Sequence, residues 1–352
     1  MNGKDNTQKL PEDANEKKTE QTPEGRNIYT ALEQAILASD FTPEEKRDKI
    51  AHLARTKREA VNILLVGATS VGKSSTINAM FNMEKAVVGE GVDPETKNMS
   101  SYELENLVLW DSPGLGDSVE ADKKYMKMIK DKLNERDSSG KALVDLVLVI
   151  LDASQKDLGT TYDCINQVLV PTLGKGEAAK RIIVALNQAD MGLKGTHWNS
   201  ELNAPDLVLT EFLEKKAESV GRRLFESTGI MFNPVYYAAG YKEPGEKQKA
   251  PYNLTKLLLL ILESIPKEKR LVVANVLNPD KNCWKFNDGK KNYAGEILKN
   301  LWESVKDGAT EYAGYGVEIG VWIMGAPGGM IGGLFGGLIG SLVGAVRFLQ
   351  GK

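Results

Sequence analysis

The sequence predicts an α/β fold in which helices cover both faces of a mostly parallel sheet. Short, almost wholly apolar runs of residues alternate with probable helices, the pattern of buried parallel strands joined by helical crossovers. One such run passes through a glycine-rich turn directly into a helix. Polar motifs follow two other runs, at the points where the strands end. Since ligands of open α/β sheets bind at the carboxyl ends of the strands, we expect one ligand site there.

The predicted elements follow one another in a regular order. The apolar strands are 61–66, 107–110, 145–152 and 181–186. The helices are one that begins near residue 75, then 121–135, 162–173 and 254–265. Residues 192–207 hold few aliphatic side chains and are expected to form a loop. We therefore expect one α/β domain at 61–266, named the nucleotide domain for the motifs described below, with flanking segments on both sides.

The N-terminal flank divides into a polar tail and a helical segment. Residues 1–26 are rich in Lys, Glu, Asp, Asn and Thr, which predicts a disordered tail. Residues 27–60 are expected to be helical, and their second helix starts with Thr42 as N-cap, Pro43 at the first position and Glu45 closing a capping box. We expect these helices to pack on the nucleotide domain, and a partner-binding arm is the alternative.

Composition excludes several functions. Lys and Arg number 45 against 48 Asp and Glu, so no overall charge indicates nucleic-acid binding. The cysteines, Cys164 and Cys283, are far apart and fit neither a disulfide framework nor a metal site, but do fit a reducing compartment. His52 and His197 are isolated and are expected to be structural or exposed. No signal or transit peptide is recognisable, so a cytoplasmic location is expected.

Residues 67–74 read Gly-Ala-Thr-Ser-Val-Gly-Lys-Ser, a complete phosphate-binding loop between a strand and a helix. Glycines at both ends let the backbone N–H groups turn inward on a phosphate, and the helix N-terminus adds partial positive charge. Lys73 is expected to reach the β- and γ-phosphates and Ser74 to ligate Mg²⁺. A glycine-rich turn with an incidental lysine is the alternative explanation. The expected nucleotide contacts here are Gly67, Ala68, Thr69, Ser70, Val71, Gly72, Lys73, Ser74 and Ser75.

A second motif, Asp111-Ser112-Pro113-Gly114, follows the strand at 107–110. An aspartate at the tip of a neighbouring strand can hold a water molecule on Mg²⁺, and the Gly114 N–H can reach the γ-phosphate. Asp-x-x-Gly is by itself a weak signal, because many turns share it. Its distance from the phosphate-binding loop strengthens the interpretation, so Asp111 becomes a candidate metal residue and Gly114 a candidate catalytic one.

The choice of base depends on Asn187-Gln188-Ala189-Asp190, which follows the strand at 181–186. A carboxylate accepts two hydrogen bonds from the N1–H and amino group of guanine, whereas adenine offers no matching pair of donors. Asp190 is therefore expected to select guanine. Asn187 is expected to tie this segment back to the phosphate-binding loop, and Gln188 to lie beside the nucleotide.

The order of these three motifs resembles the Era-like and dynamin-like GTPases of the TRAFAC class over residues 60–265. The whole chain also resembles the small predicted bacterial GTPases of the YfjP/YeeP kind. The resemblance implies a P-loop G domain that hydrolyses GTP with Mg²⁺, flanked by N-terminal helices and a Gly-rich helical C-terminal segment. It also implies that Thr96 closes on Mg²⁺ and the γ-phosphate as a catalytic residue beside Lys73, and that the Ala239 N–H donates to guanine O6.

Departures from the family pattern affect rate and affinity. Gln188 stands where family members usually have Lys, whose stem covers the base, and this predicts weaker nucleotide binding. Gly240 likewise stands where Lys is common in the last base-contacting loop. Leu115 stands where Ras-type enzymes place the glutamine that orients the attacking water, so intrinsic hydrolysis is expected to be slow. Ser70 matches the dynamin-like residue that helps to hold a monovalent cation such as K⁺. Activation by contacts within a homodimer or oligomer is one hypothesis, and an activating partner is another.

The C-terminal part contains a second informative segment. Residues 267–316 are expected to form a helical extension with a helix near 293–306. Within the Gly-rich end at 317–352, residues 319–346 carry no charge, and glycine recurs there every fourth residue. Small-xxx-small faces let helices approach closely in membranes. We expect membrane association on the cytoplasmic side, as a helical hairpin, a re-entrant segment or a tail that packs against copies of itself. A soluble hairpin buried on the chain's own core is the alternative.

These observations predict a GTP-binding protein that hydrolyses GTP to GDP and phosphate at a slow intrinsic rate. An alternative from another class is a nucleotide-gated membrane-association or assembly module in which hydrolysis is incidental. ATP hydrolysis is a third possibility, which Asp190 disfavours but the unusual Gln188 leaves open.

Overall fold

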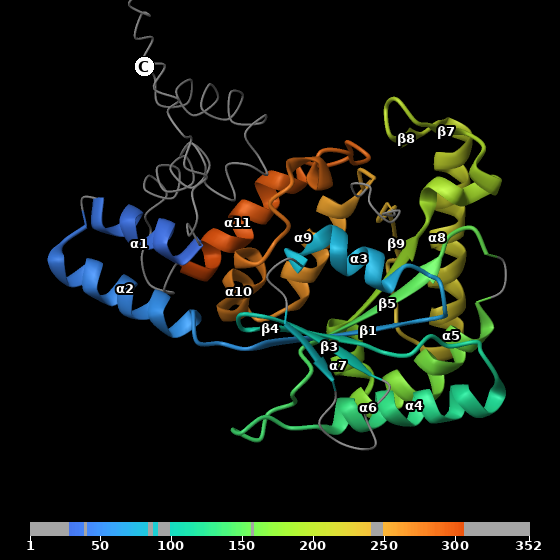
Figure 1. Ribbon diagram of the computed structural model, residues 1–352, viewed down its shortest axis with the longest axis horizontal. Coiled ribbons are helices and arrows are strands. Elements are labelled where there is room, and N and C mark those ends of the chain that lie inside the picture. Colours follow the sequence, from blue (N-terminus) through green and yellow to red (C-terminus); the bar gives the residue numbers. More distant parts are fainter. Residues whose placement is uncertain are drawn as a thin grey trace, which may run out of the picture.

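The computed structural model describes residues 28–38, 41–83, 87–90, 99–155, 158–240 and 249–305, and a seven-stranded sheet forms its centre (Figure 1). The strand order is β2-β3-β4-β1-β5-β6-β9. The strands are β1 Val61–Gly67, β2 Val87–Glu90, β3 Ser100–Leu104, β4 Leu107–Asp111, β5 Leu146–Asp152, β6 Ile182–Asn187 and β9 Val235–Tyr236. The pairs from β4 through β9 are parallel, whereas the β2–β3 and β3–β4 pairs are antiparallel, which confirms the mostly parallel sheet.

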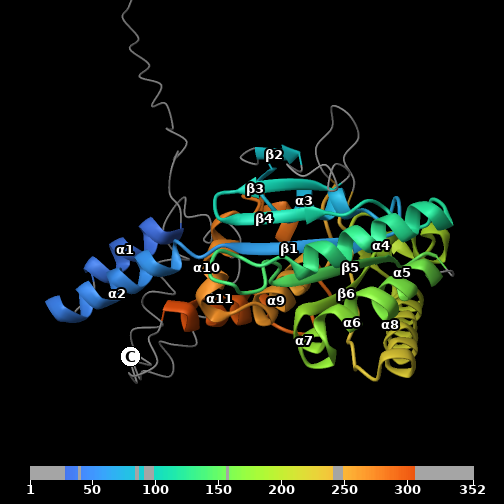
Figure 2. The ribbon, with the colours of Figure 1, turned by 90° about the horizontal axis from the view of Figure 1, so that it is seen from below.

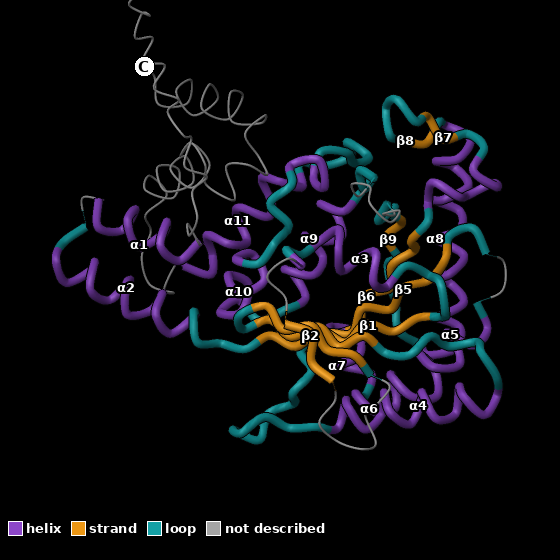
Figure 3. Tube along the Cα trace, in the orientation of Figure 1, coloured by secondary structure: helices purple, strands orange, loops and turns teal. Residues whose placement is uncertain are grey.

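Helices cover both faces of the sheet, which explains the continuous apolar strands. Figure 3 shows α3 (Lys73–Met80), α9 (Leu254–Ser264), α10 (Arg270–Asn275) and α11 (Tyr293–Val305) on one side of the sheet. The helices α4 (Val119–Asn134), α6 (Val170–Leu173) and α7 (Lys175–Arg181) lie on the other. Side chains of β1 alternate between the two cores: Ile63 belongs to the first and Leu64 to the second. Strand positions that face a helix layer on either side have to be apolar, and β1 and β5 are buried along their whole length.

The four helices predicted within 61–266 are present in the structure, as is the one predicted near 293–306. The helices are α1 Ile28–Ala38, α2 Pro43–Thr56, α3 Lys73–Met80, α4 Val119–Asn134, α5 Gly159–Cys164, α6 Val170–Leu173, α7 Lys175–Arg181, α8 Leu207–Thr228, α9 Leu254–Ser264, α10 Arg270–Asn275 and α11 Tyr293–Val305. The helix predicted at 162–173 is interrupted by a π-helical turn, Ile165–Leu169, just before Pro171. Proline has no backbone N–H to donate to the preceding turn of a helix. A widened π-helical turn just before Pro171 is consistent with that missing donor.

Residues 192–207 form more than the expected loop. A 3₁₀ segment, Ala189–Gly195, leads into a short hairpin of β7 (Trp198–Asn199) and β8 (Ala204–Pro205). The hairpin is followed by α8 (Leu207–Thr228), a helix of 22 residues that was not predicted. Asp206 caps the start of α8 by accepting a hydrogen bond from the Leu209 N–H at 3.0 Å, and Gly229 ends it with a left-handed backbone.

The two N-terminal helices, α1 and α2, lie at one end of the molecule beside α10 and α11 (Figures 1 and 2). The predicted capping box of α2 is confirmed, with the Thr42 N–H donating to Glu45 Oε2 at 2.8 Å and the Glu45 N–H donating to Thr42 Oγ1 at 3.3 Å. The Ile28 N–H donates to Asn275 Oδ1 at 3.0 Å, and Ile28 lies in the first core. The N-terminal helices therefore pack on the residues that follow Pro266.

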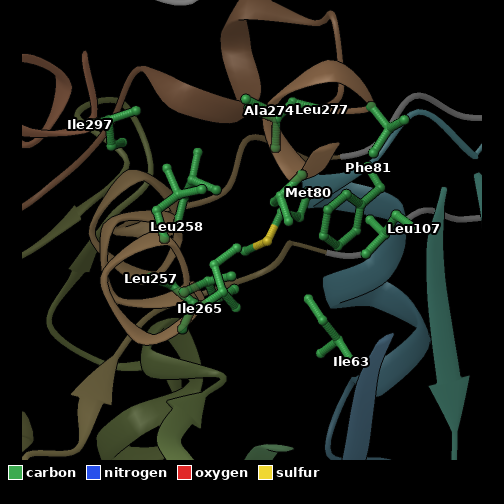
Figure 4. Close-up of a cluster of buried hydrophobic side chains, with 14 of the residues drawn as sticks. Ile63, Met80, Phe81, Leu107, Leu257, Leu258, Ile265, Ala274, Leu277 and Ile297 are labelled. Carbon is green, nitrogen blue, oxygen red and sulfur yellow. The ribbon is translucent and has the colours of Figure 1, made fainter. Parts of the chain in front are cut away.

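The segment after α10 is bonded to the far end of α3. The Asn278 N–H donates to the Met80 carbonyl at 2.9 Å and the Asn278 side chain to the Asn78 carbonyl at 3.1 Å. Figure 4 shows Met80 and Phe81 among side chains of this segment and of α9, including Leu277. One hydrophobic core thus joins the helix that follows the phosphate-binding loop to the C-terminal helices.

Three predictions fall on residues that the structure does not describe. Outside the described ranges lie the polar tail 1–26, Thr96 and the uncharged segment 319–346. Among the helices within those ranges, none is long and apolar enough to cross a membrane.

Candidate nucleotide-binding site

A pocket of about 450 Å³ lies where β1 and β4 end, and it brings together two of the three predicted motifs. The lining residues are Ser70, Gly72, Lys73, Ser74, Ser75, Ser100, Asp111, Ser112, Pro113 and Gly114. The phosphate-binding loop and Asp-x-x-Gly motif share this pocket because β1 and β4 are adjacent parallel strands. Ser100 was not predicted; it begins β3 directly opposite Asp111 in the antiparallel pair.

The backbone of the loop requires glycine at both ends. A Cβ added to Gly67 would lie 2.4 Å from the carbonyl oxygen of Ile150, which is too close for any side chain. Gly72 has φ +88°, and a Cβ there would lie 2.3 Å from Asn187 Nδ2. Ser70 holds a left-handed backbone at φ 65° without being glycine, a conformation that costs about 1 kcal/mol. The fold therefore keeps this loop curled even though one of its residues is strained.

Lys73 points back along the loop. Its Nζ donates to the carbonyl oxygens of Gly67 at 3.3 Å and Ala68 at 3.2 Å. Burial lowers the pKa of Lys73, while the nearby carboxylates of Asp111 and Asp117 act in the opposite direction. An ammonium group that is partly desolvated and lies beside a concave loop is suited to bind a phosphate.

Ser74 and Asp111 form an oxygen-rich pair at the start of α3. Ser74 Oγ donates to Asp111 Oδ2 at 3.2 Å, and Asp111 Oδ1 is buried without a hydrogen-bond partner. Burial raises the pKa of Asp111, although Lys73 and Ser74 oppose the shift. A hydroxyl and an unsatisfied carboxylate oxygen are the kinds of ligand that Mg²⁺ prefers, so these residues fit a magnesium ion.

The segment after Asp111 lies directly on the loop. Leu115 pairs with Ala68 and is only 1% exposed, inside the second core. A Cβ on Gly114 would lie 2.3 Å from Thr69 Oγ1, so only glycine fits there. Thr69 Oγ1 donates to Asp117 Oδ1 at 2.8 Å, a contact that was not predicted. Because its side chain is buried in the core, Leu115 cannot orient a water molecule in this conformation.

The predicted base motif is tied to the loop by two side chains. Asn187 Nδ2 donates to the Val71 carbonyl at 2.9 Å, which confirms the predicted tie. Gln188 Nε2 donates to the Ser70 carbonyl at 2.9 Å, so this glutamine anchors the loop without a charge. Gln188 also has a left-handed backbone, at φ 61°, which turns the chain toward Asp190.

Ala239 differs from its predicted role. Its N–H donates to Asn187 Oδ1 at 2.9 Å in the buried interior, so this donor is already used within the protein. The physical reason is the placement of β9, which brings Ala239 beside Asn187 and leaves Gly240 as the next residue of the same turn. The expected contact of the Ala239 N–H with guanine O6 is therefore corrected.

Asp190 is half buried and is not among the residues that line the pocket. Burial raises its pKa and the nearby Asp152 adds to this, whereas backbone N–H groups and Lys249 lower it. A carboxylate that is partly desolvated in this way is stabilised by a ligand that donates hydrogen bonds to it. Directly after β9, Tyr237 forms a hydroxyl–hydroxyl hydrogen bond of 2.7 Å with Thr76, which joins this segment to α3.

Comparisons with known proteins match the part of the chain that contains this site. Residues 62–188 match the family model described as "50S ribosome-binding GTPase". The chain is 31% identical to GTPase Der of Sulfurimonas denitrificans over 117 residues, which cover 31% of this chain and 22% of Der. It is 27% identical to the probable GTP-binding protein EngB of Shouchella clausii over 191 residues, which cover 52% of this chain and 88% of EngB. The matches span less than half the length of the Der and MnmE relatives.

Among solved structures, a dimerization-deficient mutant of Toc33 from Arabidopsis thaliana is 15% identical with a TM-score of 0.38, covering 69% of this chain and 98% of Toc33. A score below 0.5 supports no conclusion about function. The site geometry and the family match over residues 62–188 agree on the same strands and motifs. The central part of the chain therefore has the fold of a P-loop G domain and is similar in sequence to GTPase Der and to the probable GTP-binding protein EngB.

Proposed function

We propose that this protein binds GTP and hydrolyses it to GDP and phosphate with Mg²⁺. The observation that carries the proposal is the convergence of the curled loop and Lys73 with the Ser74–Asp111 pair in one pocket. When bound, Mg²⁺ would neutralise charge on the phosphates. Ser74 and Asp111 would hold it, with Thr96 proposed as a further ligand. Lys73 and the loop N–H groups would stabilise charge on the transferred phosphoryl group.

Guanine selection is proposed to depend on Asp190 and on the turn after β9. Gln188 and Asn187 fix the base segment on the loop, which supports placing Asp190 against the base. Because the Ala239 N–H is used by Asn187, we assign the Gly240 N–H as the donor to guanine O6. A Cβ on Gly240 would lie 2.2 Å from the Lys249 carbonyl oxygen, so only glycine fits in this turn.

We infer a slow intrinsic rate of GTP hydrolysis from Leu115. Its side chain is buried, so residue 115 contributes no side-chain group to the pocket. The missing help is proposed to come from a second copy of the chain or another partner, with a monovalent cation such as K⁺ bound near Ser70. The location proposed is the cytoplasm, where GTP is available, with membrane contact through 319–346. In the alternative, GTP gates this membrane or assembly segment, and the bonds of Asn278 to α3 favour such coupling.

The test is GTP hydrolysis by the purified full chain over a series of protein concentrations, in K⁺ and in Na⁺, with and without liposomes. Lys73→Ala serves as the inactive control. We expect slow turnover that rises with protein concentration or liposomes. A rate independent of both, and the same in either salt, would contradict activation by self-association, and an absence of GTP binding would contradict the function itself.

Base selection has its own test. Asp190→Asn replaces one acceptor by a donor, so guanine loses a hydrogen bond and the xanthine base gains a partner. We expect GTP affinity to fall by about 10- to 100-fold, the equivalent of one charge-assisted hydrogen bond, and affinity for xanthosine triphosphate to rise. Unchanged GTP affinity would refute the assignment of Asp190.

A further inference from the structure

The turn after β9, from Ala238 to Gly240, is paired with backbone that comes later in the chain. The Ala238 N–H donates to the Tyr252 carbonyl at 3.0 Å, and the Tyr252 N–H donates to the Ala238 carbonyl at 2.8 Å. Tyr252 also forms a parallel bridge with Phe286. Three short segments are therefore paired in a row, and the last of them belongs to the chain after Pro266.

Asn253, the N-cap residue of α9, ties these segments together from inside. The residue is 0% exposed, and its backbone is left-handed at φ 57°, a conformation that asparagine adopts more readily than most residues. Its Nδ2 donates to the Tyr236 carbonyl at 3.1 Å, while its Oδ1 accepts from the Asp288 N–H at 2.8 Å. Its backbone N–H donates to the Phe286 carbonyl at 2.9 Å. One buried residue thus joins the last strand of the sheet to residues 284–288, which we call the support segment.

The support segment is itself anchored on two helices. The Asp288 carboxylate, only 3% exposed, accepts hydrogen bonds from Lys256 Nζ at 2.8 Å and from the Tyr293 hydroxyl at 2.7 Å. Thr255 Oγ1 donates to the Trp284 carbonyl at 2.9 Å. Thr255 and Lys256 belong to α9, and Tyr293 begins α11. Because buried, charge-assisted hydrogen bonds are strong, the support segment provides a fixed frame for Asn253.

We propose that Asn253 is a positioning residue for the base, which sets the turn after β9 against the support segment. The support segment fixes Asn253, Asn253 fixes the Tyr236 carbonyl, and the paired backbone carries this position to Gly240, whose N–H is assigned to guanine O6. Asn187 holds the same turn through the Ala239 N–H. Guanine recognition in this chain therefore depends on residues beyond the expected end of the nucleotide domain. This inference rests on the proposed GTP binding.

A positioning role and a merely structural role differ in their effect on base preference. A variant that is only less stable loses affinity for every nucleotide alike, because a smaller fraction of the molecules is competent to bind. A displaced turn instead weakens the contact with O6 and leaves the contact of Asp190 with the 2-amino group. Two analogues separate these contacts. In 6-thioguanosine diphosphate, sulfur, a weaker acceptor, replaces O6, whereas inosine diphosphate keeps O6 and lacks the 2-amino group.

The experiment measures the affinities of the full chain for GDP and for both analogues, with Mg²⁺, by titration calorimetry. Asn253→Gly permits the left-handed backbone and removes both side-chain hydrogen bonds. We expect the ratio of GDP to 6-thio-GDP affinity to fall by about 3- to 10-fold, the size of one neutral hydrogen bond, and the ratio of GDP to inosine diphosphate affinity to change by less than about twofold. The matched control is Thr255→Val, which removes one buried bond to the support segment, leaves the contacts of Asn253 in place and should change neither ratio.

A second variant cuts only the bond to β9 and tests the proposal even if Asn253→Gly does not fold. Asn253→Asp keeps the size of the side chain and the acceptor for the Asp288 N–H, but an ionised carboxylate has no donor for the Tyr236 carbonyl. We expect the ratio of GDP to 6-thio-GDP affinity to fall here too, with circular dichroism confirming the fold.

Three results would overturn the proposal: an unchanged ratio of GDP to 6-thio-GDP affinity in a folded Asn253 variant, equal falls in both ratios, or the same fall in Thr255→Val. A wild-type chain that binds GDP and 6-thio-GDP equally well would refute the O6 contact and this inference with it. If the wild-type chain binds neither GDP nor GTP, the proposed function fails instead.

Discussion

Replacing Asn187 should unfold the protein more readily than any comparable change near the site. The Asn187 amide donates to the Val71 carbonyl and accepts from the Ala239 N–H, both at 2.9 Å and both buried. In Asn187→Ala these two backbone groups lose their partners in the interior. Each buried polar group left unsatisfied costs about 1–3 kcal/mol, so the free energy of unfolding should fall by about 2–6 kcal/mol.

The matched control is Gln188→Ala, which removes one exposed hydrogen bond to the adjacent Ser70 carbonyl. Because water can replace that partner, the expected cost is about 0.5–1.5 kcal/mol. Thermal unfolding followed by circular dichroism distinguishes the two variants, since about 3 kcal/mol lowers the midpoint by about 6–12 °C in a domain of this size. Equal midpoints for Asn187→Ala and Gln188→Ala would refute the argument that burial makes Asn187 the structural tie.

Two further predictions concern the flanking helices. Thr42→Ala removes the α2 capping box and should destabilise the protein by about 1 kcal/mol in urea unfolding, and a change within experimental error would show that α2 does not depend on its cap. Burial raises the pKa of Asp288, but hydrogen bonds from Lys256 and Tyr293 outweigh it and hold that pKa below its ordinary value. Its contribution is therefore present above the pKa of the unfolded chain and lost as pH falls through the folded value. Between about pH 5 and pH 3 wild type should lose more stability than Asp288→Asn, and parallel losses would contradict this.

Local patterns were sufficient to predict the centre of the fold. The strands, the phosphate-binding loop and the capping box of Thr42 each depend on residues close together in sequence. Helix α8 was missed, although Asp206 and Gly229 mark its two ends. Its exposed apolar residues, such as Leu207 at the first position, blur the helical periodicity.

Contacts that depend on distant segments could not be predicted from the sequence. Asp117 reaches Thr69 only because β1 and β4 are neighbours and Leu115 is buried between them and the second core. The error at Ala239 has a similar origin, since one residue of register after β9 decides which N–H faces Asn187. The sequence predicts that a turn follows β9, but it does not determine which residue of that turn contacts Asn187.

The bonds between Asn278 and the end of α3 determine how short a folded fragment of this chain can be. Pro266 follows α9 and marks the end expected for the nucleotide domain, yet the carbonyls of Asn78 and Met80 find partners only beyond it. A fragment cut at Pro266 would leave these two carbonyl groups without the hydrogen bonds from Asn278. It would also expose the apolar side chains around Phe81 that Figure 4 shows. Fragments made for nucleotide-binding work should therefore extend to residue 305, the end of α11.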